Sequence, residues 1–236
     1  MIEIVGLVKS FGQLNVLDKI DLQIKRKRVT AVVGPNASGK TTLIKCILGL
    51  TRQQAGTIIF DGKPLDGAWD YRRHIGYMPQ IARFPDHLKA REILMLLKEL
   101  RDQPGAKGER LCEAFQLDSE LDKPLGTLSG GTRQKINAIL AFLFDPDVLF
   151  LDEPTAGLDP VAGSLLKDWI MRERDDGKTI VLTSHIMSEI EELADDLAFL
   201  VNGRVSIAGS AVDIKNSTGE DKLERAIAQI IVGTKD

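Results

Sequence analysis

A short apolar run that leads into a glycine-rich turn constrains this chain more than any other feature. The run "VTAVV" starts at Val29 and is continuously apolar, as in a strand buried on both faces. The turn "GPNASGKTT" follows at Gly34, and "LIKCILGL" after it has helical spacing. A buried strand, a glycine turn and a helix in direct succession predict an α/β fold.

The turn fits the pattern G-x-x-x-x-G-K-[ST], which is typical of a loop that wraps a polyphosphate (P-loop, Walker A). Glycines let backbone N–H groups approach phosphate oxygens, and the following helix directs its positive end at the same anion. We expect Lys40 to reach the β- and γ-phosphates and Thr41 to hold Mg²⁺ through its hydroxyl. The residues expected to contact the nucleotide are Gly34, Pro35, Asn36, Ala37, Ser38, Gly39, Lys40, Thr41 and Thr42.

A second apolar run ends in two carboxylates. The stretch "VLFLDEPT" is typical of a buried strand that delivers Asp152 and Glu153 to its carboxyl end, the ligand-binding edge of an open α/β sheet. We expect Asp152 to anchor Mg²⁺ through its water shell, and Glu153 to act as general base on the attacking water. The alternative is a pair of solvated acids at a strand end.

The remaining elements predict a single domain over residues 1–236. Its core covers 1–84 and 145–215, where strands alternate with helices around a mostly parallel sheet, and "LAFLVNGRVSIAG" is a hairpin that turns at Asn202-Gly203. Residues 85–144 form a helical subdomain, and 216–236 contain a C-terminal helix. One face of that helix is apolar, which predicts core packing, with a docking face as the alternative. This face contains Leu223, Ala226, Ile227, Ile230 and Ile231.

Composition excludes several classes of function. The net charge of −3 does not draw the chain onto nucleic acid, and its two cysteines, Cys46 and Cys112, form neither a disulfide scaffold nor a zinc site. The start "MIEIVGLVKS" does not resemble a secretory signal. No run reaches the roughly 18 apolar residues that a membrane helix needs. We therefore expect any action on a membrane to go through a partner.

Between the two apolar runs, "LSGGTRQK" from Leu128 to Lys135 is similar to the signature motif of the ABC ATPases. These are the nucleotide-binding subunits of ATP-binding cassette transporters, and the resemblance covers the chain to about residue 210, with the family motifs in order. It implies a P-loop NTPase fold with helices covering the mostly parallel sheet, an N-terminal antiparallel β subdomain and the inserted helical subdomain. It also implies Mg²⁺-dependent hydrolysis of ATP.

The resemblance gives roles to four further residues. Phe11 matches the aromatic residue that stacks on adenine, and Gln80 in "YMPQ" matches the glutamine that senses Mg²⁺ and the γ-phosphate. Asp159 in "AGLDP" matches the aspartate of the D-loop, and His185 in "LTSHIMSE" matches the switch histidine that contacts the γ-phosphate. Taken singly, Phe11 would be interpreted as a core residue and His185 as structural. The shared order of the motifs favours the functional interpretation.

The signature motif predicts a second anion site. Ser129 and the amides of Gly130 and Gly131 lie at a predicted helix start, which favours anions. The chain then has two phosphate-binding surfaces and needs only one for each nucleotide. The resemblance implies a head-to-tail homodimer or heterodimer, in which each ATP lies between the P-loop of one subunit and the signature of the other. Closing of the dimer would drive motion in a membrane partner.

The chain departs from the family pattern at three positions. Thr132 replaces the usual signature glutamine, Phe11 replaces a frequent tyrosine, and Ala37 stands where many relatives have glycine. A phenyl ring still stacks, and alanine is a small change if the local backbone keeps φ negative. Thr132 could weaken contacts next to the second anion site. Because Glu153 and His185 are present, we expect a competent ATPase.

We expect a motor subunit bound to a separate membrane permease, in the cytoplasm at the inner face of the cell membrane. The segment "IARFPD", with Phe84, matches the surface that receives the permease, and local burial of this ring is the alternative. The stretch from "GLDP" to "NGRV" resembles motors of ABC-2-type exporters more than importers. "LSGGTRQK" resembles the ATPase of a copper-linked exporter for nitrous-oxide reductase maturation, although no Cys/Met/His cluster has metal-ligand spacing.

The same motifs also allow functions other than a transporter motor. A non-transport ABC ATPase, such as an Fe–S assembly ATPase, would carry the same motifs and differ in its partner. DNA-repair relatives interrupt the cassette with a coiled coil, and no sustained heptads occur here. A P-loop kinase for small molecules would leave "LSGG" unexplained. No nucleic-acid partner is expected from the acidic balance.

Overall fold

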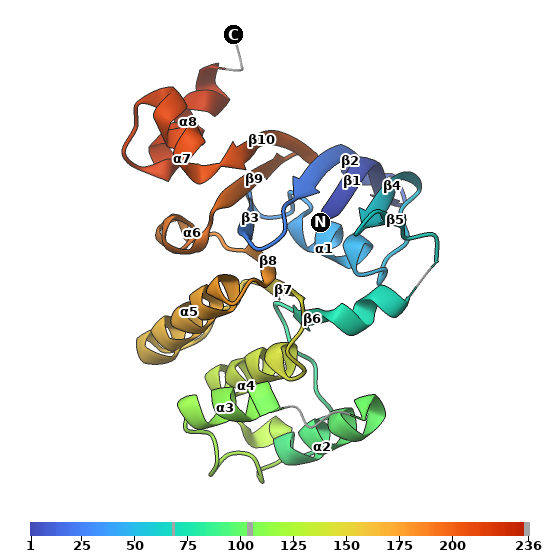
Figure 1. Cartoon of the computed structure of the whole chain (residues 1–236), viewed down its shortest axis with the longest axis vertical. Helices are drawn as coiled ribbons and strands as arrows, with labels where there is room; N and C mark the ends of the chain where they lie inside the picture. Colours follow the sequence, from blue (N-terminus) through green and yellow to red (C-terminus); the bar gives the residue numbers. More distant parts are fainter. Residues whose placement is uncertain (68, 103–105, 234–236) are drawn as a thin grey trace. The chain divides into compact units, whose positions relative to one another are not determined.

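The computed structural model describes residues 1–67, 69–102 and 106–233, and these form two compact units. The first unit contains Met1–Arg72 and Thr179–Asp236, and the second contains Arg73–Lys178 (Figure 1). Positions 234–236 of the predicted C-terminal helix lie outside the described residues. Within the described ranges, no helix is long and apolar enough to cross a membrane.

The first unit contains an antiparallel sheet with the strand order β2-β1-β4-β5. Its strands are β1 (Ile2–Phe11), β2 (Leu14–Ile24), β4 (Ala55–Phe60) and β5 (Lys63–Pro64). Along the second half of β2, Ile20, Leu22 and Ile24 are buried while the residues between them are exposed, because side chains alternate between the two faces of a strand. The predicted antiparallel β subdomain is therefore confirmed.

The first unit also contains the parallel strands that lead into the P-loop. Strand β3 (Val29–Val33) pairs in parallel with both β8 (Thr179–Thr183) and β9 (Asp196–Val201), so all five of its residues are buried. Strand β10 (Arg204–Ser210) runs antiparallel to β9. Asn202 and Gly203 both have positive φ, +48° and +74°, as a tight hairpin turn requires. The predicted hairpin is confirmed.

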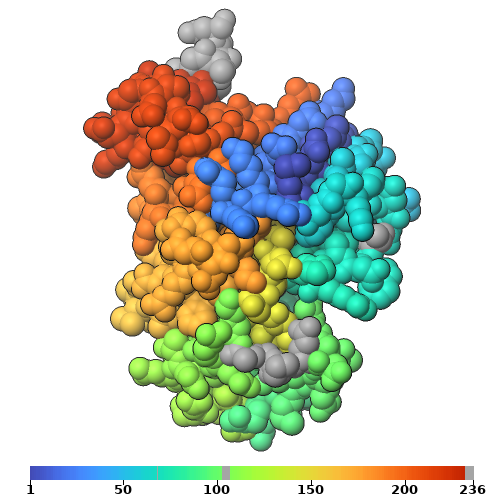
Figure 2. Space-filling model, in the orientation of Figure 1, coloured from blue at the N-terminus to red at the C-terminus, as the bar shows by residue number. Residues whose placement is uncertain are grey.

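The described residues of this unit contain four α-helices: α1 (Lys40–Ile47), α6 (Met187–Leu193), α7 (Ala211–Thr218) and α8 (Leu223–Gly233). The last two form the red surface in Figure 2. On α8, Leu223, Ala226 and Ile227 are buried, as predicted for core packing, while Ile230 and Ile231 are half-buried. Helix α7 was not predicted from the sequence.

In the part of the second unit that the structure describes, two parallel strands combine with four α-helices. Strand β6 (Ile75–Met78) pairs with β7 (Val148–Asp152). The helices are α2 (Ala90–Arg101), α3 (Ala106–Ala114), α4 (Gly130–Phe142) and α5 (Pro160–Asp175), with a 3₁₀ turn at Leu125–Thr127 before α4. The three helices predicted between the P-loop and "VLFLDE" are thus confirmed.

Helix α4 approaches strand β6 closely because Gly76 has no side chain. A Cβ atom at this position would lie 2.0 Å from the carbonyl oxygen of Ala141, so any other residue would push the helix away. This contact sets the packing distance between α4 and strand β6.

A partly buried ion cluster joins α3 to α5 within the second unit. The ammonium of Lys107 lies 2.7 Å from carboxylate oxygens of both Asp145 and Glu173, and the Glu173 side chain is only 3% exposed. Burial raises the pKa of Glu173, while Lys107 acts against this effect. Because a buried charge without its partner is costly, the cluster holds the start of α3 against the end of α5.

Candidate functional site

The P-loop connects the end of β3 to the start of α1. Gly39 is the N-cap of α1, and Thr41 and Thr42 lie in its first turn, which contains no acidic residue. The N–H groups at this helix start therefore point toward a region where an anion is favoured. The geometry agrees with the predicted phosphate-binding loop.

The first glycine of the loop is fixed by its neighbours. Gly34 has φ of +152°, and a Cβ atom here would lie 2.1 Å from the carbonyl oxygen of Leu200 on β9. No side chain fits this position. The loop therefore leaves β3 along a path that only glycine permits.

The lysine of the loop bonds to the loop itself. The Nζ atom of Lys40 lies 2.8 Å from the carbonyl oxygen of Gly34 and 2.9 Å from that of Pro35, and Lys40 is only 8% exposed. These bonds hold a positive charge over the turn at the helix start. A phosphate at this place would meet the ammonium and the helix N–H groups together.

The backbone at Ala37 differs from the expectation. Alanine was expected to be a small change from glycine if φ stays negative, but Ala37 has φ of +62°. In this left-handed region Cβ crowds the neighbouring carbonyl, at a cost of roughly 1–2 kcal/mol for a residue other than glycine. Ala37 is therefore a strained position in the loop, and the condition under which alanine would be a small change is not met.

Phe11 and His185 also lie in the first unit. Phe11 is 52% exposed at the end of β1, with the Nζ atom of Lys9 4.7 Å from its ring centroid, so interpreting it as a core residue is wrong. His185 is exposed just after β8. The backbone around His185 is held by its neighbour Ser184. The Ser184 hydroxyl oxygen accepts the N–H of Ile186 at 3.0 Å, and the same hydroxyl donates to the Glu189 carboxylate at 3.0 Å.

In the second unit, the two predicted carboxylates lie at the end of β7. Asp152 is the last residue of the strand and is buried, while Glu153 follows it, half-buried and with φ of +51°. A non-glycine residue in this region breaks the alternation of the strand and is frequent at functional sites. Burial raises the pKa of Tyr77 on neighbouring β6 to about 12, and the charge of Asp152 adds to this shift.

The signature motif begins helix α4. Ser129 is its N-cap and accepts the N–H of Thr132 at 3.1 Å, and Gly130 and Gly131 are the first two helical residues. Ser129 and Gly130 are exposed, and no acidic residue lies in the first turn. This helix start has the geometry of the predicted second anion site.

The D-loop aspartate has a structural role in this unit. Asp159 is the N-cap of α5, and its carboxylate accepts the N–H of Ala162 at 2.9 Å. Lys135 on α4 lies 3.1 Å from the same carboxylate. The Ala162 N–H, together with Lys135, holds the pKa of Asp159 below its usual range. Asp159 therefore links the signature helix to the start of α5.

Two residues of α4 that sequence reasoning missed connect the predicted catalytic positions. The amide of Gln134 donates to the carbonyl oxygens of Pro154 at 3.2 Å and Glu153 at 3.5 Å. The amide of Asn137 donates to the carbonyl oxygen of Pro79, next to Gln80, at 2.8 Å, and to the Gln134 side chain at 3.3 Å. Two buried amides on an otherwise apolar helix face were the available signal, because buried polar groups need partners.

Gln80 and the signature line one pocket of the second unit. This pocket of about 600 Å³ also contains the half-buried Phe84, Gln134 and the D-loop residue Gly157. The structure thus brings Gln80, the signature glycines and the D-loop together. The P-loop, Phe11 and His185 belong to the first unit.

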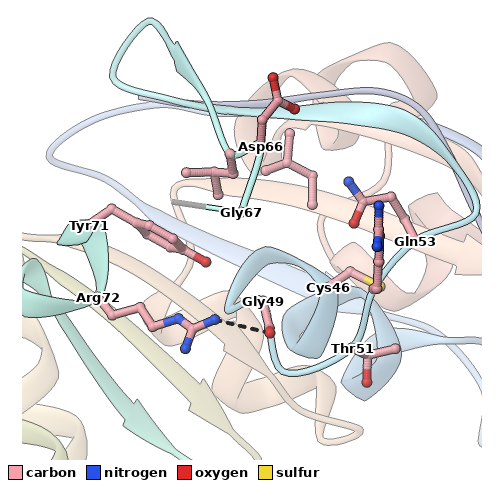
Figure 3. A pocket seen from close by; sticks show the side chains of 11 residues that line it. Cys46, Gly49, Thr51, Gln53, Asp66, Gly67, Tyr71 and Arg72 are labelled. Atoms are coloured by element: carbon pink, nitrogen blue, oxygen red, sulfur yellow. Dashed lines mark hydrogen bonds between the residues drawn. The ribbon is translucent and has the colours of Figure 1, made fainter. Parts of the chain in front are cut away.

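A different pocket, of about 450 Å³, lies beside the end of α1 in the first unit. Figure 3 shows Tyr71 and Arg72 pointing toward that end, where they donate to the carbonyl oxygens of Ile47 at 2.9 Å and Gly49 at 3.1 Å. Burial raises the pKa of Cys46, which also lines it, to about 11, so this thiol is a poor nucleophile. None of the predicted site residues lines this pocket.

Comparisons with known proteins agree with the geometry. A family model described as "ABC transporter" matches residues 17–156. The chain is 34% identical over 230 residues to the Nod factor export ATP-binding protein I of Ralstonia nicotianae, covering 95% of this chain and 72% of that protein. The structure of an ATP-binding subunit of an ABC transporter has a TM-score of 0.89 at 31% identity, covering 98% of this chain and 99% of that one. The dimeric structure of a bacterial ABC transporter cassette has a TM-score of 0.80 at 22% identity, covering 89% and 98%, and this shows the fold alone.

The phosphate-binding loop, the carboxylates at the end of β7 and the signature at the start of α4 lie within the fold that these proteins share. The chain therefore belongs to the ABC transporter family as an ATP-binding subunit, and it is an ATPase of the ABC type.

Proposed function

We propose that two copies of this ATPase, or one copy and a related subunit, close head to tail around two ATP molecules. The observation that carries the proposal is the presence of two helix starts without acidic residues in their first turns, a largely buried one at α1 and an exposed one at α4. Each favours an anion, and one nucleotide needs only one of them from each chain. A second subunit gives each ATP both surfaces.

The residues have separate roles in this proposal. Lys40 and the loop amides bind the phosphates, Phe11 stacks on the adenine, and His185 contacts the γ-phosphate. Ser129, Gly130 and Gly131 act on the nucleotide bound by the other subunit, beside the D-loop with Asp159.

Mg²⁺ fits the oxygen ligands that the chain offers. Thr41 has a hydroxyl in the first turn of α1, and Asp152 is a buried carboxylate at a strand end. Mg²⁺ prefers hard oxygen ligands and is commonly held by one or two protein groups together with substrate phosphates. When bound, Mg²⁺ neutralises charge on the β- and γ-phosphates. Thr41, Asp152 and Gln80 would hold it, and Glu153 would take the proton of the attacking water.

We further propose that the closing movement drives a membrane permease, and that the direction is export. Support comes from the relative named for Nod factor export. Phe84 supports a docking surface, since it is half-buried beside the exposed Ile81 in the second unit. The subunit would then lie in the cytoplasm, held at the membrane by its partner. The copper-linked cargo rests on the resemblance of "LSGGTRQK" alone.

The head-to-tail dimer is tested with Glu153→Gln, which removes the proposed base but keeps the shape of the side chain. Light scattering after gel filtration should show a dimer with ATP and Mg²⁺, and a monomer with ADP. The matched control is Glu113→Gln, an exposed glutamate on α3, which should hydrolyse ATP normally and show no trapped dimer. A Glu153→Gln protein that stays monomeric with ATP and Mg²⁺ would contradict the dimer.

The partner is tested by purifying the protein from its native membranes in mild detergent and identifying bound proteins by mass spectrometry. We expect a membrane protein with several spans. Purely soluble partners, such as Fe–S assembly proteins, would reject the transporter motor and leave the ATPase assignment intact.

A further inference from the structure

The threonine that replaces the usual signature glutamine contacts the signature serine directly. The hydroxyl oxygen of Thr132 lies 2.8 Å from the hydroxyl oxygen of Ser129. The N–H of Thr132 also donates to this serine oxygen, at 3.1 Å. Ser129 is exposed, whereas Thr132 is half-buried on the first turn of α4. The exposed Ser129 hydroxyl therefore contacts two groups of one residue, the hydroxyl and the N–H of Thr132.

The hydrogen-bonding capacity of a hydroxyl decides what these contacts do. A serine hydroxyl has one donor hydrogen and two acceptor lone pairs. One lone pair of Ser129 already accepts the N–H of Thr132. If the serine donates its hydrogen to a phosphate oxygen, it can interact with the Thr132 hydroxyl only as an acceptor. Thr132 then fills the second lone pair, and the serine hydrogen points away from the helix.

We propose that Thr132 is a positioning residue that aims the Ser129 hydroxyl at the γ-phosphate of ATP held by the other subunit. This inference rests on the head-to-tail dimer proposed above. The chain of bonds runs from Thr132 to Ser129 to the phosphate, and each bond polarises the next.

The positioning role of the Thr132 hydroxyl can be separated from the structural role of the Thr132 backbone. The cap of α4 depends on the N–H of residue 132, which every substitution other than proline retains. Loss of the hydroxyl alone should therefore leave folding unchanged and affect only the contact across the dimer.

The test uses variants at position 132 in the Glu153→Gln protein. Thr132→Val keeps the branched shape without the hydroxyl, and Thr132→Ser keeps the hydroxyl without the methyl group. The matched control is Thr127→Val, because the Thr127 hydroxyl donates to the carbonyl oxygen of Pro124 at 2.7 Å in the same unit. The measurement is the ATP concentration that gives half-maximal dimer in light scattering, with binding of a fluorescent ADP analogue to the monomer as a second readout.

We expect Thr132→Val to raise that ATP concentration by about threefold to tenfold, since one hydrogen bond supporting a charged contact is lost. Thr132→Ser and Thr127→Val should stay within about twofold of the parent. Binding of the ADP analogue should not change in any variant. In the protein with Glu153 intact, Thr132→Val should lower kcat more than it raises KM, because the serine contact serves the closed dimer.

The outcomes separate the two claims. If the Glu153→Gln parent stays monomeric with ATP, the dimer is wrong and the role of Thr132 falls with it. If the parent forms a dimer and Thr132→Val matches it, or Thr132→Ser fails as badly as Thr132→Val, the dimer stands and the hydroxyl has no positioning role. Should Thr132→Val not fold, Thr132→Ala makes the same comparison.

Discussion

The two helix starts that attract anions, at α1 in the first unit and at α4 in the second, are built differently. At α1 the loop is crowded: a Cβ atom on Gly34 would lie 2.1 Å from a backbone oxygen, and Lys40 supplies a buried positive charge. At α4 a Cβ atom on Gly130 would meet nothing within 4 Å, and the contacting groups, Ser129 and the amides, are neutral. The first start suits tight binding of a nucleotide by one subunit. The second suits a weaker contact that counts only after the nucleotide is bound.

The largest effect should come from removing the buried charge at the first start. Lys40→Met should lower ATP binding and hydrolysis by about 100-fold to 1,000-fold, as loss of a donor to a charged group in a shielded site commonly does. Isothermal titration with ATP would measure this. Ser129→Ala is the counterpart: it should leave binding to the monomer unchanged and impair only hydrolysis. Equal losses of monomer binding in both variants would break the distinction between the two helix starts.

The glycines of the two starts provide the next test. Gly34→Ala should destabilise the protein by more than about 2 kcal/mol, because the methyl group overlaps the oxygen of Leu200. Gly130→Ala should leave the thermal midpoint unchanged or raise it slightly, since alanine favours the helix. Its effect should instead appear as weaker ATP-driven dimerisation, where the methyl group meets the nucleotide. Thermal unfolding of both variants checks the stability difference, and a loss of stability in Gly130→Ala would contradict it.

Helix α4, which carries the second start, also contacts the segment before Gln80 through Asn137. Asn137→Ala removes the donor to Pro79 and should cost about 1–3 kcal/mol of stability by leaving a carbonyl without its partner. It should also slow hydrolysis by roughly threefold to tenfold, because Gln80 comes directly after Pro79 and loses its positioning. ATP binding by the monomer should stay unchanged. Hydrolysis per folded molecule is the measurement, with Glu113→Ala as the control. A normal rate in folded Asn137→Ala would make this residue purely structural.

The sequence predicts well those parts of the molecule whose residues are contiguous. The strand–turn–helix at Gly34 and the helix start at Ser129 were both readable, because all of their groups come from one short stretch. The bonds of Asn137 were not, since Pro79 lies 58 residues away and only the fold brings the two together. Helix α7 was missed because "AVDIKNST" contains β-branched and short polar residues that favour a helix weakly. The roles given to Phe11 and His185 still come from the resemblance and stay predictions.

The smallest expected effect concerns Ala37, where the crowded loop at α1 also carries strain. At φ of +62°, alanine is strained in a left-handed backbone conformation that glycine adopts freely. Glycine, however, loses more conformational entropy on folding than alanine does. The two terms partly cancel, so Ala37→Gly should stabilise the protein by about 0.5–1 kcal/mol. Urea unfolding would measure this, with Ala156→Gly, at a half-buried D-loop position without positive φ, as the control that should not stabilise. If Ala37→Gly instead destabilises the protein, the loop is not strained at this residue, and the difference between the two helix starts rests on Lys40 and Gly34 alone.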